Sequence, residues 1–250
     1  MSTELQGIYA LWKRELVRFW RSKSRVIGSL GMPFFFLAIL GTGLNGIVPV
    51  GGTNYLQFMA PGIVGMVLMF GSMFSGITVL MDRQFGFLRE TLVAPVSRLS
   101  IVAGKCLGGA TTAVVQAVIM LGVAMLLGAG LHLANLLVLL GFMFLISLMF
   151  VAFGVAIASV MEDMHGFQMI MNFIIMPLFF LSGALFPLTS APGALKAISM
   201  LDPLTYGVNG MRDLLIGTSD VSFGVCLAVV AGFTAVFMVL ASWLFTRIEE

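Results

Sequence analysis

The stretch D-R-Q-F-G-F-L-R-E-T-L-V-A-P-V-S-R-L-S-I-V-A-G-K, residues 82–105, is the one long polar interruption between two very apolar parts of the first 130 residues. Over the whole chain, 60% of the residues are hydrophobic and only 10% are charged, whereas soluble domains carry about 25% charged residues. Such a chain cannot cover itself with a solvated surface in water. We therefore predict an all-α integral membrane protein.

The apolar runs on either side of this stretch predict the architecture. A membrane span needs roughly 20 residues, so a chain of 250 residues holds about six spans with short loops and no second soluble domain. We expect a single membrane domain over 1–250, with Pro61 in the first turn of the second span, where its missing N–H costs little. The six spans are expected at about 26–44, 58–81, 101–128, 132–159, 166–184 and 221–245.

Glycines mark two features of the third span. A short connection around Gly128 and Gly130 makes the third and fourth spans a hairpin. Gly104-x-x-x-Gly108 offers a small-residue face for close helix packing, although one such spacing is expected by chance among 29 glycines.

Residues 6–21 suit an amphipathic helix, because apolar and basic side chains recur on opposite sides at helical spacing. We expect this helix to lie in the membrane interface, and the alternative is a soluble helix packed on a partner. The apolar side would carry Ile8, Trp12, Leu16 and Phe19, and the basic side Lys13, Arg14, Arg18 and Arg21.

The distribution of Lys and Arg predicts the orientation. Six lie in the N-terminal segment, four lie in 82–105 and Arg247 follows the last span, whereas the opposite side has only Lys196 and Arg212. Basic loops stay on the cytoplasmic side, so both termini should be cytoplasmic. Because these basic residues lie at membrane edges rather than in one patch, we expect no nucleic-acid partner.

The segment 185–220 is too long for a hairpin and too broken for a span. We expect it to be an extracellular re-entrant segment, with short helices at 194–200 and 205–216 that dip into the outer leaflet. Irregular backbone at that depth must be covered by protein or line a wet cavity. Asp202 precedes Pro203 and can cap the second helix; the alternative for its carboxylate is substrate binding.

Residues that could perform chemistry are scarce. No P-loop is present, since Gly104-Lys105 is followed by Cys106 and lacks the upstream glycine. Neither cysteine belongs to a set with metal-ligand spacing. The trio Glu162, Asp163 and His165 comes closest to a polar cluster. We therefore expect no catalytic, cofactor-binding or metal site in this chain.

Three motifs stand out, which are R-E-T-L-V-A-P-V-S-R (89–98), P-L-F-F-L-S-G-A-L-F-P-L (177–188) and L-D-P-L-T-Y-G-V-N-G-M-R (201–212). A fourth, Q-F-M-A-P-G (57–62), opens the second expected span. Together they resemble the permease subunits of type-2 ABC exporters, within the daunorubicin-resistance-like and polysaccharide-export permease superfamily. The order of elements also matches, so the resemblance covers essentially the whole chain, and it is closest to the daunorubicin-resistance-like branch.

The resemblance implies an ATP-driven exporter of a hydrophobic or amphiphilic substrate, such as a drug, a lipid or a lipid-linked glycan. Two permease copies, expected as a homodimer, would form the pathway in a bacterial-type inner membrane. Two ABC ATP-binding subunits, which hold ATP and Mg, would attach from the cytoplasm, so the ATPase is a separate subunit.

The same resemblance assigns ATPase coupling to 82–98, with help from the N-terminal helix. An apolar centre with a charged rim suits a protein–protein contact, and the alternative is a loop bound to lipid headgroups. The expected coupling residues are Arg83, Phe85, Gly86, Phe87, Leu88, Arg89 and Glu90.

The pathway should be lined by the second and fifth spans along the dimer interface, where a wall of Phe and Met suits an apolar cargo. The candidates are Phe70, Met73, Phe74, Asn172, Met176 and Phe180.

Two other classes remain open. A stand-alone secondary multidrug carrier would need a titratable residue inside the membrane, and the expected spans contain almost none. A membrane enzyme acting on lipids would need a cluster of polar residues at one depth. A channel would leave 82–98 unexplained.

Overall fold

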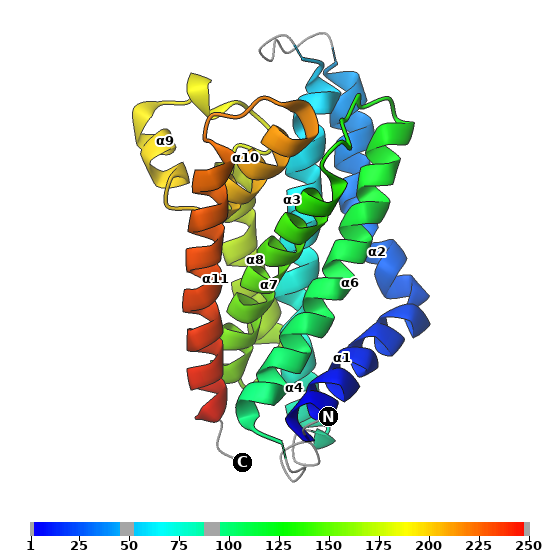
Figure 1. The fold of residues 1–250 in the computed structure, drawn as a ribbon, viewed down its shortest axis with the longest axis vertical. Helices are drawn as coiled ribbons and strands as arrows, with labels where there is room; N and C mark the ends of the chain where they lie inside the picture. The colour runs from blue at the N-terminus through cyan, green and yellow to red at the C-terminus, as the bar shows by residue number, and fades with distance from the viewer. Residues whose placement is uncertain (1–2, 46–52, 88–95, 248–250) are drawn as a thin grey trace.

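The computed structural model describes residues 3–45, 53–87 and 96–247, and within them every regular element is helical (Figure 1). Within these residues, five helices are long and apolar enough to cross a membrane, with Tyr55–Gln84 taken as one, or six if the bent pair at the N-terminus counts as one span. The predicted all-α integral membrane fold is confirmed. The helices are α1 (Thr3–Arg21), α2 (Lys23–Phe35), α3 (Tyr55–Ser75), α4 (Ile77–Gln84), α6 (Arg98–Leu126), α7 (Leu136–Val160), α8 (Met164–Leu181), α9 (Gly193–Ser199), α10 (Pro203–Ile216) and α11 (Phe223–Thr246).

The bundle has two distinct ends. The first turn of α1, the whole of α4 and the last turn of α11 lie at one end, which we call the α4 end, whereas α9 and α10 lie at the other (Figure 1). Hydrogen bonds tie the α4 end together: Ser97, before α6, donates its N–H to the Glu4 carboxylate (3.0 Å). Arg98 donates to the carbonyl of Thr246 on α11 (2.6 Å).

The first expected span is the least regular part of the bundle. It begins after α1 and α2 meet at a bend of 69°. Pro33, inside α2, lacks an N–H and crowds the preceding turn. The chain then continues as a π-helix over Phe36–Gly41, which accommodates the disturbed hydrogen-bond ladder.

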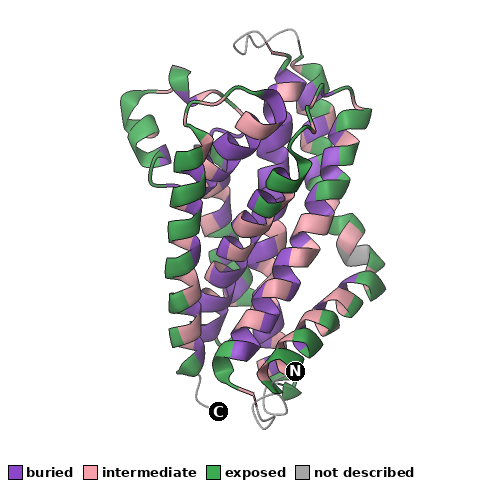
Figure 2. Cartoon of the chain, viewed as in Figure 1, coloured by how far each residue is buried: buried purple, intermediate pink, exposed green. Residues whose placement is uncertain are grey.

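The core is built around α3, which is buried along most of its length (Figure 2). Close packing depends on glycine at two points. A Cβ at Gly62 would lie 2.7 Å from the Ala184 Cβ, and one at Gly76 would overlap the Gly154 carbonyl oxygen. The expectation that Pro61 lies in the first turn of this span is wrong, because α3 begins at Tyr55 and Pro61 is inside the helix.

The connection between α6 and α7 forms the predicted hairpin. Gly128 follows α6 with a φ of 93°, a conformation that glycine adopts without a steric penalty. His132 then donates its backbone N–H to the carbonyl of Leu215 on α10 (2.7 Å). The hairpin is thereby fixed to the α10 end of the bundle.

The two short helices predicted in 185–220 are present as α9 and α10. Asp202 caps α10 by accepting from the Leu204 N–H (2.9 Å), which confirms the capping interpretation. Gly217 ends α10 in the left-handed conformation. Most of α10 is buried among α3, α7 and α11, whereas α9 is largely exposed.

Arg212 does not lie at a headgroup surface, although it was counted among the basic residues on the outer side. Its side chain is 5% exposed. The guanidinium donates to the Gly183 carbonyl (3.1 Å) and lies 3.9 Å from the centre of the Phe58 ring. Arg212 therefore joins α10 to α3 and to the turn after α8.

Candidate functional site

Five charged side chains gather where α1, α4 and α6 meet near the α4 end. Asp82 accepts from Lys105, from Arg14 and from Arg18, the last at 3.3 Å. Glu15 pairs with Arg18 at 3.5 Å. We call these five residues the charge cluster.

The charge cluster is largely shielded from solvent. Asp82 and Lys105 are each 2% exposed and Glu15 is 7% exposed. Buried ions must be paired, because removal from water is very unfavourable for an isolated charge. Three cations and two carboxylates satisfy this requirement jointly.

Sequence reasoning missed this cluster. Asp82 was expected at the end of a span and Lys105 in a cytoplasmic segment, so neither was expected to be buried. Arg14 and Arg18, expected on the basic side of an interfacial helix, turn inward onto Asp82. The four-residue spacing of the two arginines is the one signal that placed them on a common face.

Helix α1 is docked onto α6 through the small-residue face predicted there. A Cβ at Gly104 would lie 2.9 Å from the Leu11 Cβ, and one at Gly108 would lie 2.7 Å from the Glu15 Cβ. Trp12 donates its indole N–H to the Thr111 hydroxyl (3.1 Å). Trp12, which was expected on the side that faces the membrane, therefore packs on protein, and Phe19 of the same side is also buried.

The first four residues of the expected coupling set lie at the α4 end, directly after the charge cluster. Gly86 has a φ of 79°, and it separates two exposed rings, Phe85 at 64% and Phe87 at 51%. Arg83 donates to the Met161 carbonyl (3.4 Å), which lies between α7 and α8. Leu88, Arg89 and Glu90 lie outside the described residues.

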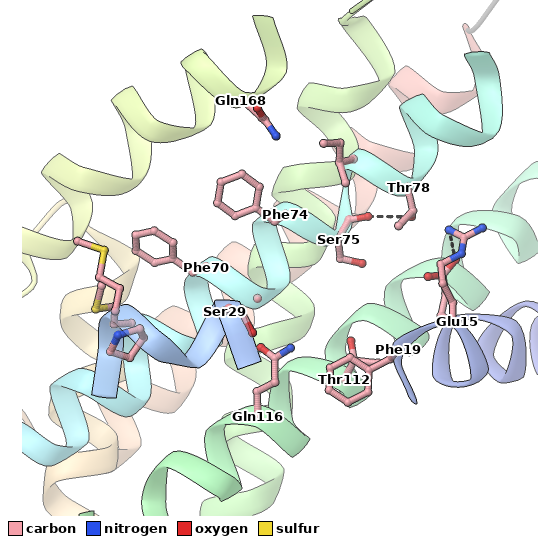
Figure 3. A pocket seen from close by; sticks show the side chains of 17 residues that line it. Glu15, Phe19, Ser29, Phe70, Phe74, Ser75, Thr78, Thr112, Gln116 and Gln168 are labelled. Carbon is pink, nitrogen blue, oxygen red and sulfur yellow. Dashed lines mark hydrogen bonds and ion pairs between the residues drawn. The ribbon is translucent and has the colours of Figure 1, made fainter. Parts of the chain in front are cut away.

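A cavity of about 530 Å³ lies between α1, α2, α3, α6 and α8, with the first turn of α4 also in its wall (Figure 3). Apolar side chains such as Phe70 and Phe74 form much of its wall. The polar side chains in the wall include Ser75, Thr112 and Gln116. Glu15 and Arg18 line one edge, so the cavity adjoins the charge cluster.

The expected pathway residues divide into three groups. Phe70 and Phe74 line the cavity, whereas Met73 is fully buried in the core. Asn172, Met176 and Phe180 are on α8 beyond the cavity wall, where Asn172 and Phe180 are exposed and Met176 is half-buried. The cavity-lining residues that sequence reasoning missed include Gln116 on α6 and Gln168 on α8.

The trio Glu162, Asp163 and His165 forms no ligand set in the structure. Asp163 caps α8 by accepting from the Gly166 N–H (2.5 Å). Over the described ranges, no three His, Cys, Asp or Glu side chains are arranged to hold a metal ion.

The helical bundle, with five or six candidate spans among the described residues, is that of a multi-pass membrane protein. A family model described as ABC-2 type transporter matches residues 6–216, and the chain belongs to this family. Membership implies association with an ABC ATPase subunit. The predicted resemblance to such permeases is confirmed.

Named relatives agree with this assignment. A chain described as a transport permease, ycf38, of Cyanophora paradoxa is 31% identical over 84% of this chain and 74% of the relative. Nodulation protein J of Rhizobium meliloti is 27% identical over 95% of this chain and 92% of its own length. The daunorubicin resistance ABC transporter permease protein DrrB1 of Streptomyces coeruleorubidus is 28% identical over 94% of this chain and 84% of its own length.

Proposed function

We propose that this chain is the permease subunit of an ATP-driven ABC exporter that moves a hydrophobic or amphiphilic molecule out of the cytoplasm. Two copies would form the pathway in a bacterial-type inner membrane. Each would bind an ABC ATPase subunit that holds ATP and Mg. The permease supplies the path and the coupling contact, and the partner hydrolyses ATP.

The observation that supports this proposal most strongly is the pair of exposed rings at Phe85 and Phe87. Large apolar side chains with a charged rim are typical of a protein–protein contact. Arg83 contributes to that rim and also bonds to the α7–α8 connection. A force applied at this point would reach α4, α7 and α8 directly.

The N-terminal helix would transmit the same movement. Arg14 and Arg18 on α1 bind Asp82 on α4, three residues before Phe85. Glu4 binds Ser97, which precedes α6. Helix α1 is thus attached on both sides of the segment 82–98, so we infer that it moves with that segment when the ATPase subunits close.

The excess of Lys and Arg supports a cytoplasmic position for the α4 end, by the positive-inside rule. Burial of Arg212 strengthens the argument, because it leaves Lys196 as the one exposed basic side chain among the described residues expected outside.

The cargo class is supported by the cavity. Its wall contains two phenylalanines of α3 together with Met32, Pro33 and Met66, a lining suited to an apolar body. The related proteins include one named for daunorubicin resistance and one named for nodulation, so the relatives take part in different processes.

Burial of Asp82 gives the stand-alone carrier one supporting observation, since a proton-coupled carrier needs a buried carboxylate. Asp82, however, already binds Lys105, Arg14 and Arg18. These three pairings occupy the carboxylate, so we favour a structural role for it over proton exchange.

Co-purification with an ABC ATPase subunit tests the proposal. Wild type should form a stable complex, and Phe87→Asp should lose it, because a charge replaces an apolar contact. Phe186→Asp, an exposed ring beyond α8, is the matched control and should keep the complex. Failure of wild type to bind any ABC ATPase subunit would overturn the proposal.

A further inference from the structure

Gln116 is a buried amide in the wall of the cavity between α1, α2, α3, α6 and α8. Its side chain is 5% exposed, and it extends from α6 toward Ser29 (Figure 3). The Oε1 atom is fully buried and accepts no hydrogen bond. A buried acceptor in this state is unfavourable, because it has lost water without gaining another donor.

The position of this oxygen is restricted by α3. A Cβ at Gly71 would lie 2.9 Å from the Gln116 Oε1, so the close approach depends on glycine at that position. Gly71 itself lines the cavity. The amide is therefore held just behind the surface of the cavity, and a ligand reaches Oε1 when the side chain turns toward that space.

The rest of the wall sets the kind of ligand. The Phe70 and Phe74 rings are 6.3 Å apart and inclined by 32°, which provides an extended aromatic surface suited to other rings. Glu15 and Arg18 line one edge but are paired with each other at 3.5 Å. Their opposite charges offset one another, which favours an uncharged ligand.

We propose that this cavity binds an uncharged, ring-bearing molecule that donates one hydrogen bond, from an N–H or an O–H group, to the Gln116 Oε1. The rings of the ligand lie against Phe70 and Phe74. Identification of this ligand as cargo rests on the proposed exporter function, whereas the binding site itself does not.

The test uses two probes of the same shape. N-phenyl-1-naphthylamine has one N–H between two ring systems, and its fluorescence rises in apolar surroundings. 1-Phenoxynaphthalene carries an ether oxygen in place of that N–H. The full chain in lipid nanodiscs is titrated with the amine after subtraction of the signal from empty nanodiscs, and the ether is measured by displacement.

We expect wild type to bind the amine about tenfold more tightly than the ether, since one matched hydrogen bond to a buried acceptor has this order of effect. Gln116→Met should remove that preference by weakening the amine about tenfold and leaving the ether nearly unchanged. Phe70→Ala should weaken both probes together.

Gln6→Met is the matched control, because Gln6 on α1 is an exposed amide that does not line the cavity. It should leave both affinities within about twofold, since an exposed amide is already solvated. Thermal unfolding of each variant checks the fold, and Gln116→Met should unfold no earlier than wild type.

Equal affinity of wild type for the two probes would overturn the proposal, because it would mean that water satisfies the Gln116 amide. A preference for the amine that survives Gln116→Met would also overturn it, as would a signal no larger than that of empty nanodiscs. A chain that prefers the amine but binds no ATPase subunit would retain this site and lose the exporter function.

Discussion

Asp82 on α4 and Lys105 on α6 form an ion pair in which each side chain is only 2% exposed. The pair connects the helix that enters the segment 82–98 to the helix that leaves it. Arg14 and Arg18 add α1 to the same carboxylate. Three helices at the α4 end thus share one buried anion.

Removal of that anion should be costly. Asp82→Asn leaves three cations facing a neutral amide, and we expect the free energy of unfolding to fall by about 3–5 kcal/mol. Glu162→Gln, an exposed carboxylate near the same end, should change it by less than about 0.5 kcal/mol. Thermal unfolding in detergent measures both.

The double variant Asp82→Asn/Lys105→Met distinguishes the loss of an ion pair from two independent losses of stability. Because it removes one cation together with the anion, it should be more stable than Asp82→Asn alone by about 1 kcal/mol or more. Strictly additive losses would show that the two residues do not act as a pair.

Docking of α1 depends on glycine in α6. Gly108→Ala brings a Cβ within 2.7 Å of the Glu15 Cβ, and we expect overpacking to lower the free energy of unfolding by about 1–3 kcal/mol. Protease cleavage between α1 and α2 should become faster as α1 detaches.

Gly122→Ala provides the control within the same helix. Apart from the adjacent residues and the nearby backbone of α6, nothing lies within 4 Å of a Cβ built there, so alanine should stabilise the helix by about 0.5–1 kcal/mol. If Gly108→Ala were also stabilising, the close contact between α1 and α6 would be refuted.

Asp202 should make stability depend on pH. Burial raises the pKa of its carboxyl to about 7 from an ordinary value of 3.8. The native state therefore binds a proton that the unfolded chain releases, so this stabilisation is complete below the unfolded pKa and is lost as the pH rises through about 7. The unfolding temperature should fall across that interval.

Asp202→Asn keeps a capping oxygen and remains neutral. We expect it to unfold at a higher temperature than wild type at about pH 8 and at nearly the same temperature at about pH 4. Asp202→Ala also loses the cap, so its free energy of unfolding should be about 1 kcal/mol lower than that of Asp202→Asn. An identical pH profile in wild type and Asp202→Asn would contradict the raised pKa.

Arg212 should be important for stability rather than for headgroup contact. Arg212→Met leaves the Gly183 carbonyl without its donor, and we expect a loss of about 2 kcal/mol in the free energy of unfolding. Lys196→Met, an exposed residue on α9, should have little effect. Comparable losses in the two variants would place Arg212 at the surface.

The features that could be predicted from sequence are those with local signals. Asp202 followed by Pro203 predicted the start of α10, and the glycines at 128 and 130 predicted the hairpin, because a cap or a turn is determined by neighbouring residues. The position of Pro61 was predicted wrongly, since the apolar pattern gave no indication that α3 begins earlier, at Tyr55.

The charge cluster could not be predicted, because its members come from three helices and only the tertiary packing brings them together. Which residues of α8 reach the cavity could not be predicted either, because tertiary packing decides it. Asn172 and Met176 follow Gln168 at four-residue intervals, so the three lie on one side of the helix. Only Gln168 is part of the cavity wall, and its position depends on where α8 crosses α3.

The proposed exporter function is tested most directly by transport in reconstituted vesicles. N-phenyl-1-naphthylamine fluorescence follows movement of the probe with the chain alone, with the chain and its ABC ATPase, and with an imposed proton gradient. We predict movement only when the ATPase subunit and ATP-Mg are both present. Movement by the chain alone under the proton gradient would contradict the account and establish a secondary carrier.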